Sequence, residues 1–134
     1  MTVDKKSLKT AFDNLSTSNA SPDMVFIGCP HCSLSEVKHA AELLEGKKVK
    51  EDVRFWVCAS RHVRAKANSH VRTIEAAGGK VVSDLCAVVT WLRELGVDTL
   101  MTNSAKTAFY SPTMNRVNVR FAMLQQCVET ACQK

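Results

Sequence analysis

The chain has no apolar run long enough to cross a membrane, because polar residues interrupt each hydrophobic stretch well before about 18 residues. Its first residues, Met-Thr-Val-Asp-Lys-Lys, also lack the hydrophobic core of a secretory signal. Internal repeats and low-complexity segments are absent as well. We therefore expect a cytoplasmic protein that makes no membrane contact.

Aromatic residues are scarce, at 6% of the sequence. The formal net charge of +5 suits anionic partners such as phosphates or nucleic acid. The lysines and arginines are spread over predicted helices and loops, however, and few aromatic rings are present to stack on bases. We interpret the basic residues as solvated surface, and nucleic acid is not an expected partner.

The rest of the composition is that of an ordinary globular domain, with 46% apolar and 23% charged residues. A chain of 134 residues can bury a core without covalent cross-links. In a reducing cytosol its cysteines are better interpreted as buried thiols, metal ligands or catalytic groups than as disulfides. The six are Cys29, Cys32, Cys58, Cys86, Cys127 and Cys132.

Short apolar strands alternate with helical patterns along the chain. Strands are predicted at 24–27, 53–58, 80–83 and 99–102, and helices at 5–15, 34–44, 63–74, 88–95 and 119–131. This alternation predicts a three-layer α/β fold, in which helices cover both faces of a mostly parallel sheet of about four strands. We divide the chain into an N-terminal helix and linker, 1–21, and an α/β domain, 22–134.

Polar residues follow each predicted strand. In an open α/β sheet the ligand crevice lies beyond the carboxyl ends of the strands. The loops that begin there contain thiols, hydroxyls, an amide, an aspartate and cations, and they span 28–31, 59–61, 84–86 and 102–106. The sequence therefore predicts one functional site along this edge of the sheet.

Two cysteines stand at predicted strand ends, Cys29 and Cys86, and for them we favour ligation or catalysis over packing. Cys29 also lies near the start of a predicted helix, where the unpaired N–H groups favour a thiolate. Two thiolates are too few for an iron–sulfur cluster or a structural zinc, which take about three or four protein ligands. A further ligand would come from another side chain or another polypeptide. Cys127, on the last predicted helix, is interpreted as a packing residue, with a position facing the site as the less favoured reading.

Two other residue types bear on this edge. Lys106 follows a run of hydroxyl and amide groups. This position predicts a site that binds a phosphate or carboxylate anion. The alternative is an ordinary solvated lysine. The histidines on predicted helices, His39, His62 and His70, are interpreted as ordinary surface or packing residues. His31 differs because the loop places it beside Cys29.

A series of segments, taken in order, resembles the C-terminal part of the large subunit in the aconitase X family. The segments are Gly28-Cys29-Pro30-His31, Ser33-Leu34-Ser35-Glu36, Ser60-Arg61, Glu75-Ala76-Ala77-Gly78, Asp84-Leu85-Cys86, Thr102-Asn103-Ser104-Ala105-Lys106 and Tyr110-Ser111-Pro112. The resemblance covers roughly 22–132. Members of the family are hydro-lyases, the phosphomevalonate and cis-3-hydroxyproline dehydratases, in which an iron or iron–sulfur centre acts as a Lewis acid on a substrate hydroxyl.

The resemblance implies roles for the residues at the predicted edge. Cys29 and Cys86 would ligate an iron–sulfur cluster or a mononuclear iron, and Lys106 would bind a small anionic hydroxy acid. Weaker candidates for substrate contact are Ser60, Asn103 and Ser104. The family's large subunits are much longer, so the remaining large-subunit region and a small swivelling subunit are the implied partners, and the chain is expected to be inactive alone.

The sequence departs from the family pattern at Leu85, where a threonine is usual, near Phe109, where a histidine is usual, and at Cys32. Two alternatives stay open. One is a thiol–disulfide oxidoreductase using Cys29-Pro30-His31-Cys32, although more strand–helix units follow this motif than a thioredoxin core holds. The other is a non-catalytic interaction domain, whose expected sign is an exposed apolar patch.

Overall fold

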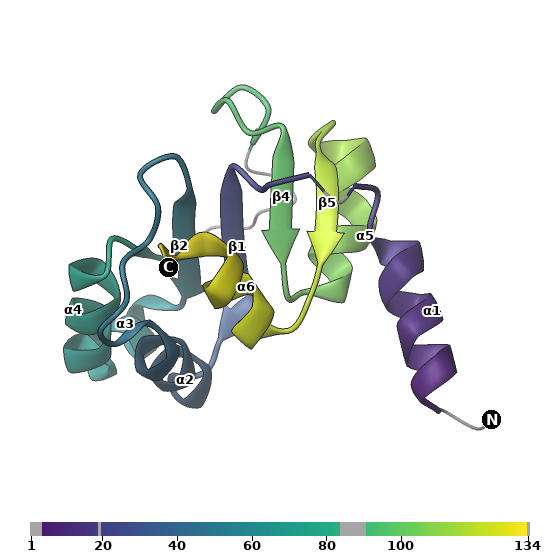
Figure 1. The fold of residues 1–134 in the computed structure, drawn as a ribbon. Helices are drawn as coiled ribbons and strands as arrows, with labels where there is room; N and C mark the ends of the chain where they lie inside the picture. Colours follow the sequence, from purple (N-terminus) through teal and green to yellow (C-terminus); the bar gives the residue numbers. More distant parts are fainter. Residues whose placement is uncertain (1–3, 19, 84–90, 134) are drawn as a thin grey trace.

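The computed structural model describes residues 4–18, 20–83 and 91–133. A sheet of five parallel strands forms the middle layer, in the order β3-β2-β1-β4-β5 (Figure 1). The strands are β1 (Met24–Cys32), β2 (Arg54–Ala59), β3 (Lys80–Ser83), β4 (Thr99–Thr102) and β5 (Asn118–Phe121). The helices are α1 (Lys5–Leu15), α2 (Leu34–Leu44), α3 (Arg61–Lys66), α4 (Asn68–Ala76), α5 (Ala105–Met114) and α6 (Leu124–Ala131).

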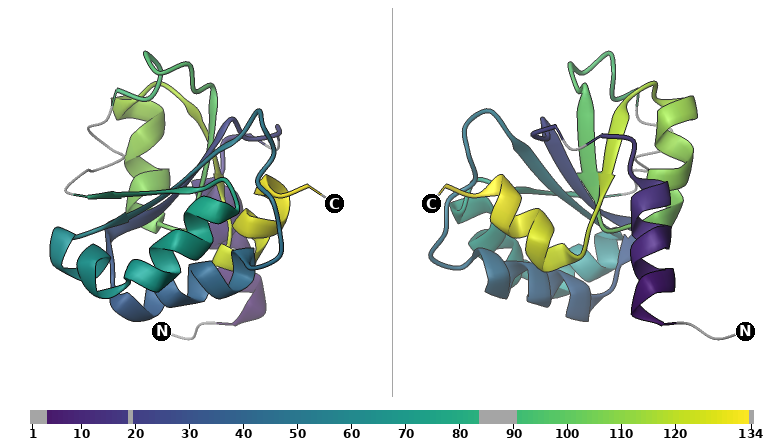
Figure 2. Two further views of the ribbon diagram at one scale, coloured as in Figure 1. Left: turned by 90° about the vertical axis from the view of Figure 1, so that its left-hand side faces the viewer. Right: turned by 45° about the vertical axis from the view of Figure 1, so that its right-hand side comes forward.

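Helices lie on both faces of the sheet, with α2, α4 and α6 on one side and α5 on the other (Figures 1 and 2). Neighbouring residues of β1 enter different cores, since Val25 belongs to the cluster under α2, α4 and α6 while Phe26 belongs to the cluster under α5. This continuous burial is typical of a parallel sheet that is covered twice. The predicted α/β class, with a mostly parallel sheet and helices on both faces, is confirmed.

Several predicted elements need correction. The sheet has five strands and not about four, because β5 and α6 occupy the segment predicted as one helix over 119–131. Val117, Val119 and Phe121 alternate with polar residues, which is the period of a strand. Helix α5 was not predicted, because it contains Pro112, which normally disfavours a helix interior.

Two further helices differ from their predicted extents. The helix predicted over 63–74 is two helices, α3 and α4, separated at Ala67, whose backbone leaves the helical conformation. The helix predicted over 88–95 lies partly outside the described residues, and residues 92–96 form turns. The capping box predicted from Ser33 to Glu36 is present at the start of α2, with both of its hydrogen bonds formed.

The segment before β1 covers the free edge of β5. The backbone N–H of Thr17 donates to the Val119 carbonyl at 2.8 Å, and its hydroxyl accepts from the Val119 N–H at 2.8 Å. The Ser16 hydroxyl accepts from the Phe121 N–H at 2.9 Å. An uncovered edge strand would present these groups to other chains. Residues 16–18 are therefore held against the sheet although they belong to the predicted linker.

The end of β1 departs from the regular ladder. Ile27 lies opposite Val57, and Cys32 lies opposite Ala59. Residues 28–31 of β1 therefore stand against the single residue Cys58 of β2. The extra residues form a bulge, 28–31, at the carboxyl edge of the sheet. Gly28 begins it with φ +113°, and a Cβ at this position would overlap with the carbonyl oxygen of Cys58 and lie 2.9 Å from the Cys32 Sγ. The bulge therefore requires glycine at this position.

Replacing this glycine tests how tightly the bulge is packed. We expect Gly28→Ala to lower the free energy of unfolding by at least about 2 kcal/mol, because the alanine meets both an unfavourable φ and the β2 backbone. Gly46→Ala is the matched control, since Gly46 has φ +76° but nothing within 4 Å of its Cβ position, and about 1 kcal/mol is expected there. Urea unfolding of the two variants measures the difference, and equal losses would contradict the packing argument.

The cover on β5 is testable by removing one acceptor. Thr17→Val leaves the Val119 N–H without its hydroxyl partner, and we expect a loss of about 1 kcal/mol in the free energy of unfolding. Thr10→Val makes the same chemical change on the exposed surface of α1, where an effect within about 0.5 kcal/mol is expected. Thermal or urea unfolding followed by circular dichroism checks both, and an unchanged Thr17→Val protein would exclude the contribution.

Candidate functional site

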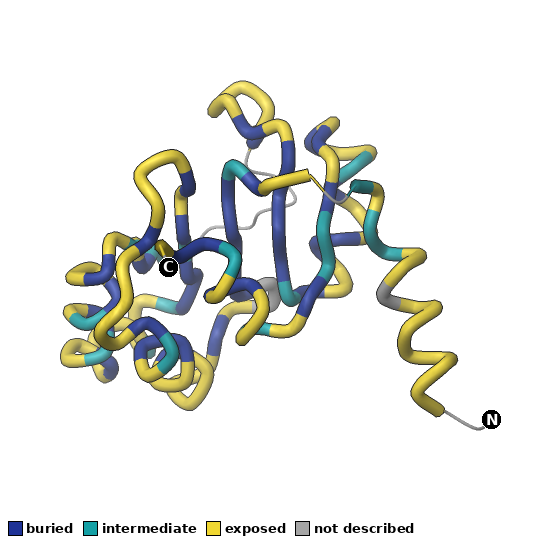
Figure 3. The backbone as a smooth tube through the Cα atoms, in the orientation of Figure 1, coloured by how far each residue is buried: buried dark blue, intermediate teal, exposed yellow. Residues whose placement is uncertain are grey.

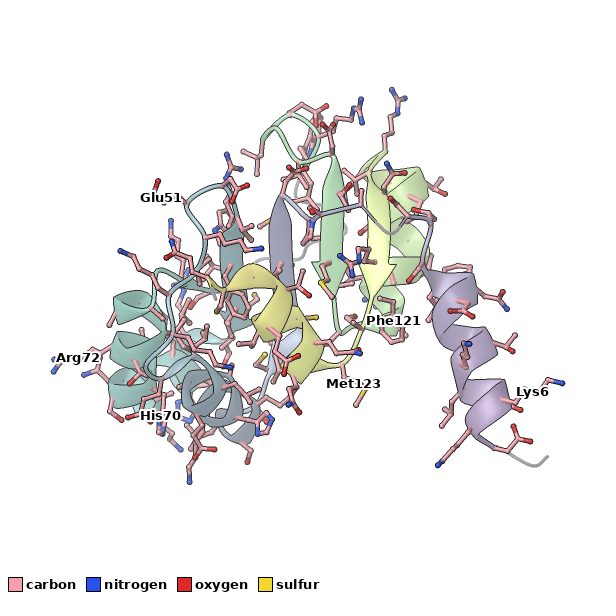
Figure 4. All side chains as sticks on the ribbon, viewed as in Figure 1. Lys6, Glu51, His70, Arg72, Phe121 and Met123 are labelled. Carbon is pink, nitrogen blue, oxygen red and sulfur yellow. The ribbon has the colours of Figure 1, made fainter. Side chains whose placement is uncertain are left out.

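The sheet order brings the predicted site segments to one edge. The strands lie side by side in the order β3, β2, β1 and β4. Cys86 follows β3 in the sequence, Ser60 follows β2, Cys29 lies near the end of β1, and Lys106 follows β4. All of these strands run in the same direction, so their carboxyl ends form a single row, with neighbouring strands about 5 Å apart. This confirms the shared edge for the described strand ends. The edge also lies at the carboxyl end of β5, where Figure 4 labels Phe121 and Met123.

The centre of this row is the point where the chain reverses its direction across the sheet. The chain first adds β2 and then β3 on one side of β1, and later adds β4 and then β5 on the other side. After β1 it enters α2 on one face, and after β4 it enters α5 on the opposite face. Such a switch point opens a crevice between the two connections, where ligands bind in open α/β sheets. The bulge 28–31 and the segment 103–106 lie on the two sides of this switch point.

The bulge carries the tetrapeptide Gly28-Cys29-Pro30-His31. The side chains of Cys29 and Pro30 lie outside what the structure describes, as do Cys86 and its neighbours Asp84 and Leu85. His31, the last residue of the bulge, is exposed. The ligand assignments of Cys29 and Cys86 thus stay predictions, supported by the position of the Cys29 backbone at the middle of the edge.

Cys32 is not part of the predicted site. Its side chain is 2% exposed and belongs to the core beneath α2. Burial, followed by the nearby Glu36 and Cys58, raises the pKa of the Cys32 thiol to about 12. The thiol is therefore protonated at neutral pH and supplies no thiolate to the edge.

Serine side chains at this edge cap helices. The Ser60 hydroxyl accepts from the Val63 N–H at 3.2 Å at the start of α3, and the Ser104 hydroxyl accepts from the Thr107 N–H at 3.1 Å at the start of α5. Each hydroxyl is a predicted substrate contact and also stabilises a helix end by about 1 kcal/mol. Asn103, directly before the cap of α5, is half-buried.

Lys106 is the second residue of α5 and is exposed. The first turn of a helix carries partial positive charge, so a cation there is disfavoured by about 0.3–1 kcal/mol. The first turn of α5 contains no acidic residue that would offset this charge. The start of α5 therefore combines a lysine with a positive helix end, an arrangement that favours an anion.

Two buried hydroxyls near the same edge have no hydrogen-bond partner among the described residues, Ser83 at the end of β3 and Thr107 in the first turn of α5. Buried polar groups in folded proteins are nearly always paired. Both atoms are enclosed by the protein, so neither faces the open edge. Sequence reasoning did not single out either residue, since an unpaired hydroxyl is recognisable only from its surroundings.

The described residues contain no group of three or more histidine, cysteine, aspartate or glutamate side chains that could hold a metal ion. Cys127 is 0% exposed and its Sγ contacts the Ala122 carbonyl at 3.7 Å. Burial raises the pKa of the Cys127 thiol to about 12, so the structure lends its ligand assignment no support. An iron centre held by Cys29, Cys86 and a further ligand stays a prediction.

The remaining histidines lie on helices, as expected from the sequence. His39 and His62 are exposed, and His70 is half-buried on α4 beside the exposed Arg72 (Figure 4). None of them forms part of a metal-binding cluster in the described part of the chain. Helices long and apolar enough to cross a membrane are likewise absent from that part.

A groove of about 660 Å³ lies away from the predicted residues, between the α1–β1 segment, β5 and α6. It is lined by charged and hydroxyl side chains that include Asp13, Arg120 and Glu129. No local sequence pattern predicts this groove, because its walls come mainly from the two ends of the chain, with Met101 of β4, and meet only in the folded protein.

The comparisons with known proteins agree on one family. Residues 22–133 match the family model described as the aconitase X third domain. The phosphomevalonate dehydratase large subunit of Methanocaldococcus jannaschii is 41% identical over 131 residues, which cover 96% of this chain and 32% of the relative. The cis-3-hydroxy-L-proline dehydratase of Pseudomonas aeruginosa is 37% identical over 134 residues, covering 96% of this chain and 23% of the relative.

A solved structure agrees with the sequence relatives. The crystal structure of Thermococcus kodakaraensis aconitase X in its holo-form superposes with a TM-score of 0.85 at 35% identity, covering 98% of this chain and 34% of that chain. The chain thus spans about a third or less of the length of these relatives. It belongs to the aconitase X family and corresponds to the third domain of that family.

Proposed function

We propose that the chain is part of an iron-dependent hydro-lyase that removes water from a small anionic hydroxy acid, such as mevalonate 5-phosphate or cis-3-hydroxyproline. The proposal rests mainly on one observation, the meeting of the bulge 28–31 with the start of α5 at the switch point of a parallel sheet. The relatives at 41% and 37% identity are dehydratases of these two substrates by name. The enzyme is proposed to act in the cytoplasm.

Cys29 and Cys86 would hold the iron–sulfur cluster or mononuclear iron. When bound, the iron supplies a Lewis acid that polarises the hydroxyl that leaves as water. The chain itself contributes two thiolates at one sheet edge, and the partial positive charge at helix starts favours the deprotonated form of such thiols. A third ligand comes from outside this chain.

Lys106 would bind the carboxylate or phosphate of the substrate, together with the positive end of α5. Ser60, Asn103 and Ser104 would add neutral contacts from the neighbouring loops. These groups orient the hydroxyl toward the metal because β1 and β4 are adjacent in the sheet.

The partners of this domain would be the remaining region of a large subunit and a small swivelling subunit. The M. jannaschii relative is itself a large subunit, and this chain spans 32% of it. Alone, the domain would be inactive, because it lacks a complete ligand set.

The two alternative functions fare differently. The buried Cys32, with its pKa raised to about 12, gives no support to a dithiol oxidoreductase using Cys29 and Cys32. An exposed apolar patch, expected for an interaction domain, is present on α5 and includes Phe109, Tyr110 and Met114. An interaction surface is compatible with the hydro-lyase, whose site needs a second polypeptide.

Iron binding tests the ligand assignment. In a chimera that carries this chain in place of the third domain of the M. jannaschii large subunit, joined by its small subunit, we expect iron after anaerobic reconstitution with iron and sulfide. Cys29→Ser and Cys86→Ser should each lose most of it, whereas Cys32→Ala is the matched control and should retain it. Iron analysis by mass spectrometry decides, and parent-level iron in the two serine variants would refute the assignment.

Substrate binding tests Lys106. In the same assembly Lys106→Met removes one charge-assisted hydrogen bond, so we expect KM for the anionic substrate to rise about 10- to 100-fold with unchanged iron content. Lys48→Met is the control, because Lys48 is exposed on the connection that leads to the opposite edge of the sheet. Steady-state kinetics with mevalonate 5-phosphate and with cis-3-hydroxyproline measures the effect, and identical KM values in both variants would rule out this role.

A further inference from the structure

Helix α5 buries small residues and exposes large apolar ones. Thr107, Ala108 and Ser111 are at most 1% exposed and face the sheet. On the outward face, Phe109 is 66%, Tyr110 46% and Met114 58% exposed. The rings of Phe109 and Tyr110 meet edge to face with centroids 5.0 Å apart. The outward side of α5 is thus an ordered apolar surface.

The other helices show what a solvated face looks like in this protein. The outward positions of α2 carry Glu36, Lys38 and Glu42. Large apolar side chains are rarely grouped on the surface of a free domain, so the outward face of α5 is atypical of a free surface. Aromatic residues and methionine are the types enriched at the buried centres of protein interfaces.

The apolar surface continues past the end of α5. Trp91 is 73% exposed, and the next residue, Leu92, is held by its N–H to the Asn115 side chain at 3.2 Å, directly after α5. At the other end the surface reaches Lys106, which shares the outward side of α5. The surface therefore borders the candidate site.

The N-terminal helix leads to the same side of the molecule. Leu15 of α1 packs into the core beneath α5, while Leu8, two helical turns earlier, is 50% exposed. Figures 1 and 3 show the exposed start of α1 projecting beyond the carboxyl ends of the strands, on the side of β5 and α5. Lys6 on this projecting turn is labelled in Figure 4.

We propose that the outward face of α5 (Phe109, Tyr110 and Met114), extended by Trp91, is the docking surface for the first two domains of an aconitase X large subunit. The occupant follows from two observations. The chain matches a third domain and spans 32% of the M. jannaschii subunit, so such a subunit contains further domains that pack against the third. The surface adjoins Lys106 at the edge of the proposed site.

This inference rests on the proposed function for the identity of the partner but is tested without catalysis. The probe is the M. jannaschii large subunit shortened by its third domain, and the measurement is its affinity for this 134-residue chain in the absence of iron and substrate. We expect a defined complex by analytical ultracentrifugation and calorimetry. Phe109→Ala should weaken it by about 30-fold, the effect of removing an interface hot spot.

Met114→Ala and Met123→Ala form the matched pair of variants. Met114 is 58% and Met123 63% exposed, but Met123 lies before α6 on the other layer. Only Met114→Ala should weaken the complex. Because the side chains of Phe109, Met114 and Met123 are exposed, the variants should keep the circular dichroism and unfolding midpoint of the parent chain.

Oxidation of the two methionines tests the docking surface without any substitution. In the free chain, hydrogen peroxide should oxidise Met114 and Met123 at similar rates, whereas in the chimera with the M. jannaschii domains Met114 should be protected at least about 10-fold more than Met123. Mass spectrometry of the peptides measures both rates.

Three results would overturn the proposal: no complex with the parent chain, equal protection of the two methionines, or a dimer of the free chain that Phe109→Ala dissociates. The last would make a second copy the occupant. Failure of the hydro-lyase function is recognised separately, by a complex that forms through α5 but binds no iron and turns over neither substrate.

Discussion

The architecture depends on one central strand. β1 is buried on both faces and pairs in parallel with β2 on one side and β4 on the other. Because each of these pairs is parallel, every carboxyl end points to the same edge, and each connection must cross a face of the sheet. A helix follows β1, β2 and β4 directly. The change of side at β1 creates the switch point. Gly28 then lets β1 leave the ladder at that place.

The bulge and the helix starts complement one another. A bulge turns Cys29 and His31 out of the ladder at the middle of the sheet edge, while α5 brings a lysine and unpaired N–H groups to the adjacent strand end. A metal-held hydroxyl and a substrate anion require opposite features, thiolates for the metal and positive charge for the anion. In the proposed site, Cys29 on β1 and Lys106 after the neighbouring β4 would supply one of each within about one strand spacing, while Cys86 follows β3, on the far side of β2.

Under the proposed function the third domain is incomplete in both chemistry and packing. Its two candidate ligands, Cys29 and Cys86, are too few for a centre that takes about three or four. Helix α5 leaves large apolar side chains bare on its outward face. The two deficits lie side by side, since Lys106 belongs to both the site and the outward side of α5. A second polypeptide on this surface would remedy both at once, which explains how a domain spanning 32% of a relative fits into an enzyme.

Strong local signals made parts of the structure predictable from the sequence. The helical pattern from Leu34, the capping box at Ser33 and the β-branched residues of β2 each act within one element, so periodicity and capping identify them. β5 was mistaken for a helix, because four residues hold too little periodicity to outweigh the helix that follows. α5 was missed, because Pro112 opposes a helix locally, while packing of the inner face of α5 against the sheet stabilises it.

By itself the sequence determined the α/β class, the family resemblance and which loops carry thiols, hydroxyls and lysine, since all of these are properties of consecutive residues. Tertiary structure alone decided the order of the strands, because pairing depends on contacts between residues far apart in the chain. That order makes β1 and β4 neighbours and so unites 28–31 with 103–106. The tertiary structure also decided which cysteines are buried and protonated, because the pKa of a thiol depends on desolvation by residues that are distant in the sequence.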